Sequence, residues 1–120
     1  MNILVFGIGN PGRGDDALGP LLVDAMQALR IPGVEMLVDF QLQIEHVLDL
    51  HGRDSVVFVD AALNMLTPFE FVPAQATVSH AYTSHALAPG ALLAAYESHW
   101  GAPHPPAHIL AVRGRHFDLG

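Results

Sequence analysis

Two short apolar runs, at residues 3–6 (ILVF) and 56–59 (VVFV), constrain the fold more than any other feature of this sequence. Each run is continuous, so that both alternating faces of an extended chain would carry apolar side chains. Strands with this pattern are buried on both faces, as in parallel sheets that have helices packed on either side. The two runs therefore predict the centre of a mostly parallel sheet.

The remainder of the chain alternates between helical and extended patterns. We expect further strands at residues 34–38, 69–72 and 108–112, and helices that begin near residues 15, 44 and 87. This order predicts an α/β fold, a three-layer αβα sandwich whose twisted sheet has about five strands, in a single domain over residues 1–120. The chain stops soon after the last expected strand, so we expect the closing C-terminal helix to be absent and one edge or face of the sheet to be uncovered.

Composition excludes several classes of function. The absence of cysteine and lysine removes disulfides, zinc–thiolate sites, cysteine nucleophiles and lysine Schiff bases. Five arginines against twelve carboxylates give a net charge of −7, which disfavours nucleic acid or an anionic membrane as a partner. With no recognisable signal peptide or membrane span, we expect a cytoplasmic monomer. The eight histidines are the one compositional sign of metal or proton chemistry.

A glycine-rich loop, GIGNPG at residues 7–12, follows the first expected strand. This spacing matches the G-x-G-x-x-G pattern of dinucleotide-binding sites. In such a site the diphosphate rests on a helix N-terminus, where Asp15 and Asp16 of this chain would repel it, and Pro11 removes a backbone donor. The loop is then either a tight reversal of the chain or a turn that presents a carboxylate.

Three polar residues are predicted at the carboxyl end of the sheet. Asp60 ends the expected strand at 56–59, Asp16 opens the first helix, and His85 precedes the third helix. Ligands of open α/β sheets bind beyond the carboxyl ends of the strands, where the strand order reverses. Asp16 also fits a helix cap and Asp60 a turn residue, but together with one imidazole they would form a mixed oxygen–nitrogen site for a divalent metal.

Three sequence blocks together resemble the hydrogenase maturation proteases. These blocks are GIGN (7–10) with GDDALG (14–19), then FVDA (58–61), then Ser84-His85, in the family's order and spacing. Proteases of this family remove a C-terminal peptide from the large subunit of [NiFe]-hydrogenases after nickel has been inserted. The resemblance implies a peptidase whose partner is a large-subunit precursor and which holds no permanent cofactor, because the nickel is carried by the substrate.

The resemblance also assigns roles to individual residues. It implies that Asp16, Asp60 and His85 recognise the nickel and support cleavage, and that Gly9, Asn10 and Asp39 bind the substrate. The chain departs from the family in two places: the D-G-G-T-like turn after the second strand is DFQL at residues 39–42, and the family's final helix is missing. The segment QLQIE at residues 41–45 is similar to a branch that serves bidirectional, NAD-linked hydrogenases.

Other interpretations remain open at this point. A protein of the same fold could bind the metal or the large subunit without cleaving it. The opening GIGNPG is also similar to that of bacterial peptidyl-tRNA hydrolases, which carry a histidine soon after it, whereas the first histidine of this chain is His46. A nucleotide-binding protein would be stabilised by NAD or ATP and not by nickel.

Overall fold

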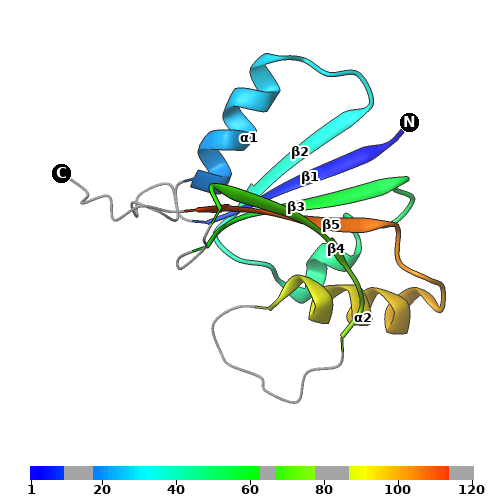
Figure 1. Cartoon of the computed structure of the whole chain (residues 1–120). Helices are drawn as coiled ribbons and strands as arrows, with labels where there is room; N and C mark the ends of the chain where they lie inside the picture. Colours follow the sequence, from blue (N-terminus) through cyan, green and yellow to red (C-terminus); the bar gives the residue numbers. More distant parts are fainter. Residues whose placement is uncertain (10–17, 63–66, 78–86, 114–120) are drawn as a thin grey trace.

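A computed structural model describes residues 1–9, 18–62, 67–77 and 87–113 (Figure 1). Within these ranges the chain forms five strands, two α-helices and one 3-10 helix in the order βαβηββαβ. The elements and their bounds are β1 (Ile3–Ile8), α1 (Leu18–Ala28), β2 (Val34–Asp39), η2 (Ile44–Val47), β3 (Ser55–Ala62), β4 (Phe69–Ala74), α2 (Pro89–Trp100) and β5 (Ala107–Arg113).

The five strands form one sheet with the order β2-β1-β3-β5-β4. β1 is parallel to β2 and to β3, with Ile3 in register with Val34 on one side and with Ser55 on the other. β5 continues the parallel part of the sheet beside β3, and β4 alone runs antiparallel, at the edge. The expected α/β fold with a mostly parallel sheet is therefore confirmed.

Helices lie on both faces of the sheet and form the outer layers of the sandwich (Figure 1). α1 packs on β1, β2 and β3, and its buried Val23 meets Val5 and Val59. On the opposite face, η2 and α2 pack together over a larger core that includes Phe6, Phe58 and Leu92. Neighbouring strand residues thus face different cores, which is why the runs at 3–6 and 56–59 contain no polar side chain.

Two elements differ from the sequence-based expectation. The second helix is a single 3-10 turn of four residues, followed by hydrogen-bonded turns up to His51. β3 is longer than predicted, because its pairing with β5 continues to Ala62 after its pairing with β1 has ended at Val59. Asp60 therefore lies inside the strand, and the expectation that the strand ends there was wrong.

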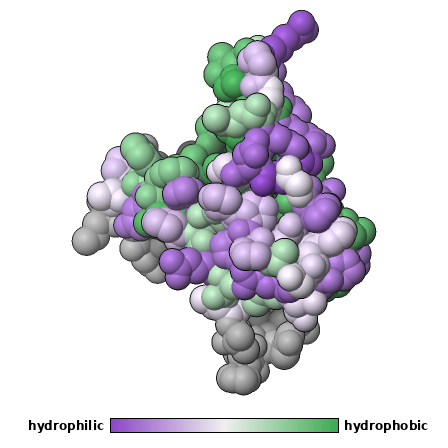
Figure 2. All heavy atoms as spheres, turned by 90° about the vertical axis from the view of Figure 1, so that its right-hand side faces the viewer, coloured by the Kyte–Doolittle hydropathy of each residue, from purple (hydrophilic) through white to green (hydrophobic). Residues whose placement is uncertain are grey.

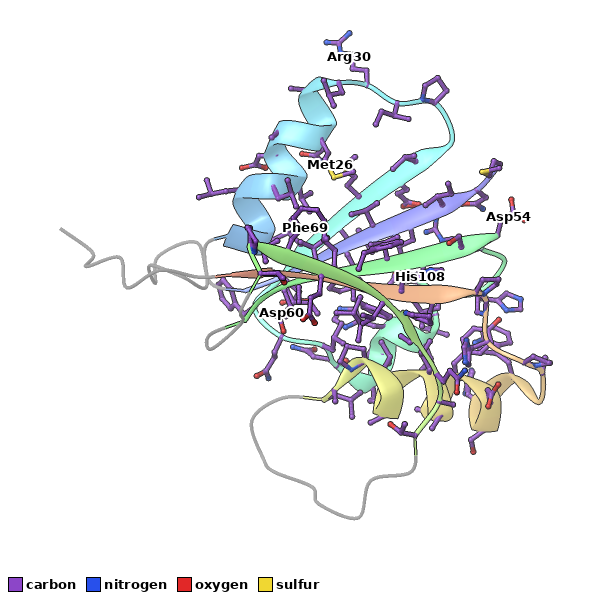
Figure 3. All side chains as sticks on the ribbon, in the orientation of Figure 1. Met26, Arg30, Asp54, Asp60, Phe69 and His108 are labelled. Carbon is purple, nitrogen blue, oxygen red and sulfur yellow. The ribbon has the colours of Figure 1, made fainter. Side chains whose placement is uncertain are left out.

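The α1 side of the sheet is less completely covered near β4. Phe69 and Phe71 are 62% and 54% exposed, and Phe71 stacks on His108 of the neighbouring strand. Phe69 lies on the same side of the sheet as α1 (Figure 3), and Figure 2 shows apolar residues around a hollow between α1 and this edge. An uncovered part of the sheet was expected from the sequence. Residues 114–120, where a closing element would begin, lie outside the described part of the chain.

No helix among the described residues has the length and apolar character needed to cross a membrane.

Substitution of one buried and one exposed phenylalanine of the sheet tests the assignment of the hydrophobic core. Phe58 is fully buried, so Phe58→Ala should lower the free energy of unfolding by about 3–5 kcal/mol. The matched control is Phe69→Ala, which removes the same atoms from an exposed position and should change stability by less than about 1 kcal/mol. Urea unfolding of both variants measures the difference, and comparable losses would contradict the assignment of the core.

Candidate functional site at the carboxyl end of the sheet

The carboxyl ends of β1, β2 and β3 lie side by side. The chain goes from β1 outward to β2 and then returns to the other side of β1 as β3, so the strand order reverses at β1. This is the position at which α/β sheets bind their ligands. Three of the predicted site residues, Gly9, Asp39 and Asp60, lie at this end within the described residues.

Gly9 follows β1 directly and joins it to the end of β2. Its backbone N–H donates to the carbonyl oxygen of Asp39 at 2.9 Å. Its φ angle is 148°, a conformation that residues with a side chain rarely adopt. Glycine at this position is therefore explained by its backbone conformation, and residues 10–12, which complete the predicted loop, lie outside the described residues.

The Asp39 carboxylate contacts two nitrogen groups. Oδ1 accepts the N–H of Phe40 at 2.7 Å, and Oδ2 lies 3.3 Å from Nε2 of His46 in the η2 turn. The side chain is 37% exposed, so it also faces solvent at the end of the sheet. A carboxylate with a restricted orientation and an open side is suited to accept hydrogen bonds from a bound ligand.

His46 was not predicted as a site residue. Its Nδ1 accepts the N–H of Gln43 at 2.8 Å, and its ring packs edge-on against Phe6 with the ring centroids 4.6 Å apart. Since Nδ1 is an acceptor, the ring proton lies on Nε2, the nitrogen that faces Oδ2 of Asp39 at 3.3 Å. The only signal in the sequence was a histidine seven residues after the aspartate that ends a strand, and it becomes informative only when the η2 turn is known.

Asp60 lies on the same face of the sheet as Asp39. Val56 and Phe58 belong to the η2 and α2 side, and the alternation of side chains along β3 extends this side to Asp60. Leu37 packs on the same core and extends the side along β2 to Asp39. In Figure 3 Asp60 lies near the carboxyl end of β3. The two carboxylates are two strands apart, roughly 10 Å from one main chain to the other.

Asp16, Asn10 and His85 lie outside the described residues, so their predicted roles remain predictions. In the part of the chain that the structure describes, no three histidine or carboxylate side chains gather closely enough to hold a metal ion. Asp60 and Asp39 alone supply the carboxylates of the site as far as it is described.

The fold matches several solved structures of hydrogenase maturation proteases. HycI, a [NiFe] hydrogenase maturation protease from Thermococcus kodakarensis KOD1, is similar over 93% of this chain and 73% of its own, with a TM-score of 0.69 and 27% sequence identity. The hydrogenase maturating endopeptidase HybD from E. coli is similar over 99% of this chain and 78% of its own, with a TM-score of 0.70 and 20% identity. The chain resembles the [NiFe] hydrogenase maturation proteases.

A further solved structure agrees with this resemblance. The hydrogenase 2 maturation peptidase from Thaumarchaeota archaeon SCGC_AB-539-E09 has a TM-score of 0.62 and 20% identity, over 96% of this chain and 80% of its own. At such identities the likeness concerns the fold alone. No protein-family model matches the sequence, and the search of curated proteins found no match. The similarity to the NAD-linked branch of the maturation proteases stays a prediction.

The backbone at Gly9 provides a test of the site's geometry. Gly9→Ala should lower the free energy of unfolding by about 1–3 kcal/mol, because alanine is strained at a φ of 148°. Gly52→Ala is the control: its φ of 78° lies in the left-handed helical region and the space around it is open, so the loss should stay near 1 kcal/mol. Thermal and urea unfolding measure both, and a larger loss at Gly52 would contradict the described turn.

Proposed function

We propose that this chain is an endopeptidase that removes a C-terminal peptide from the large-subunit precursor of a [NiFe]-hydrogenase. The observation that carries the proposal is the similarity to the maturation protease HycI, which extends over 93% of this chain at 27% identity. Two carboxylates support it, Asp39 at the end of β2 and Asp60 near the end of β3, because this end of the sheet can offer them to a bound segment.

We further propose that the protease recognises the nickel that its substrate carries. Asp16, Asp60 and His85 would complete the coordination of that nickel, and Gly9, Asn10 and Asp39 would bind the adjoining peptide. Two carboxylates and one imidazole form a donor set that suits a divalent metal which keeps other ligands. Asp60 supports this assignment by its position at the carboxyl end of β3, on the same face as Asp39.

Recognition of the nickel would restrict cleavage to precursors whose metal centre is complete. It would also place the scissile bond beside the carboxylates. In the cleavage step a water oxygen attacks the peptide carbonyl carbon, and a base, one of the carboxylates or His85, takes the water's proton. The C–N bond breaks and the leaving amine receives a proton. A metal beside the carbonyl lowers the barrier by polarising it and by stabilising the negative charge on its oxygen.

The proposal is tested by intact mass spectrometry of a large-subunit precursor before and after incubation with this protein. We expect the nickel-loaded precursor to lose a C-terminal peptide and the nickel-free precursor to stay intact. Loss from both precursors would refute nickel recognition while leaving the peptidase. Binding of the precursor with no change in its mass would instead identify a non-catalytic module.

Neutralising single carboxylates tests the metal-recognising residues. Asp16→Asn and Asp60→Asn should each slow cleavage of the nickel-loaded precursor by about a hundredfold or more, since each removes an anionic ligand or base. Asp24→Asn, which makes the same change at an exposed position on α1, should cleave at the wild-type rate. The rates are read from the same mass assay, and full activity of Asp16→Asn would overturn the assignment.

A further inference from the structure

We infer that His46 is a positioning residue that orients the Asp39 carboxylate toward the substrate peptide. The inference rests on the proposed function and deepens it, because it names a residue outside the set that the sequence assigned to the site. It also names what Asp39 recognises: N–H donors of the peptide segment bound at the carboxyl end of the sheet.

The His46 ring is fixed by three different contacts. Nδ1 accepts the Gln43 N–H at 2.8 Å, the ring stands edge-on to Phe6 at an interplanar angle of 76°, and Nε2 lies 3.3 Å from Oδ2 of Asp39. Phe6 is fully buried, so this contact ties the ring to the core of the protein. The side chain of His46 is only 12% exposed. The ring is therefore a rigid support and has little room to change its orientation.

Both ring nitrogens are engaged, and this limits what His46 can do. Nδ1 is occupied by a backbone N–H, and Nε2 carries the ring proton and lies 3.3 Å from Oδ2 of Asp39. Neither nitrogen is available to take a proton from water in this arrangement. His46 therefore acts through Asp39, as histidine and carboxylate pairs do when one orients the other.

Asp39 is the group that can meet a ligand. Its Oδ1 accepts the Phe40 N–H and its Oδ2 lies 3.3 Å from Nε2 of His46, yet its side chain remains 37% exposed. Each carboxylate oxygen can accept a second hydrogen bond, so the open side of the group can accept N–H donors from a peptide backbone or from a cationic side chain. Its neighbours at this end of the sheet are the Gly9 turn and, two strands away, Asp60.

Two substitutions separate positioning from a purely structural role. In His46→Gln the side-chain amide N–H can occupy the position of Nε2, but no acceptor remains for the Gln43 N–H. His46→Asn places an amide oxygen at the reach of Nδ1, where it can accept the Gln43 N–H, and loses the donor to Asp39. Both variants lose the ring contact with Phe6, so they are matched in this respect.

For cleavage of the nickel-loaded precursor, we expect His46→Asn to raise KM about tenfold with kcat little changed, because a bond to an oriented carboxylate has been lost. His46→Gln should stay within about threefold of the wild-type KM. The Kd for the precursor should follow the same order. If His46 only stabilises the η2 turn, activity will follow thermal stability, and His46→Gln will be as impaired as His46→Asn or more so. That result would overturn the inference.

A spectroscopic measurement makes the inference independent of cleavage. The nitrogen-15 chemical shifts of the wild-type His46 ring should show Nδ1 unprotonated and Nε2 protonated, and the reverse tautomer would overturn the inference. Should the wild-type protein leave every precursor uncut, the proposed function would fail. The ring shifts and the order of the three Kd values would still decide whether His46 positions Asp39 for binding.

Discussion

The pairing of β1 on both of its sides is the interaction on which the rest of the structure depends. Because β1 is parallel to β2 and β3, its residues face two different cores, with Phe6 on one face and Val5 on the other. Two cores require helical layers on both faces, which α1 supplies on one side and η2 with α2 on the other. The same pairing brings the ends of β1 and β2 level with residue 60 of β3. This is how Gly9 comes to donate to Asp39, and how Asp39 and Asp60 come to share one face at the same end.

Most of the fold was predictable from local patterns, since continuous apolar runs and glycine or proline breaks are properties of short segments. The runs at 3–6 and 56–59 are the centres of β1 and β3, and the alternating segment at 69–72 is the exposed strand β4. The position of β4 beside β5, and its antiparallel direction, depend on pairing between segments about forty residues apart along the chain. Neither segment alone indicates this pairing, so it could not be predicted from the sequence.

The candidate site was predictable where a residue's place follows from the strand that contains it. Asp39 ends β2 and Gly9 follows β1, as expected. The length of β3 was underestimated, because its extension past Val59 is stabilised by β5 and not by its own sequence. The role of His46 was not predicted because it depends on contacts with Asp39, Gln43 and Phe6. Two of these partners, Asp39 and Phe6, belong to different strands.

The strand order has a consequence for how the protein is made. β4 precedes β5 in the chain but joins the sheet only through β5, which lies between β3 and β4. During synthesis the ribosome releases β4, with its exposed Phe69 and Phe71, before its pairing partner exists. β4 can pair with β5 only after residues 107–113 have emerged and have inserted beside β3. In that interval the unpaired strand exposes aromatic side chains and unpaired backbone groups, a combination that is prone to misassociation.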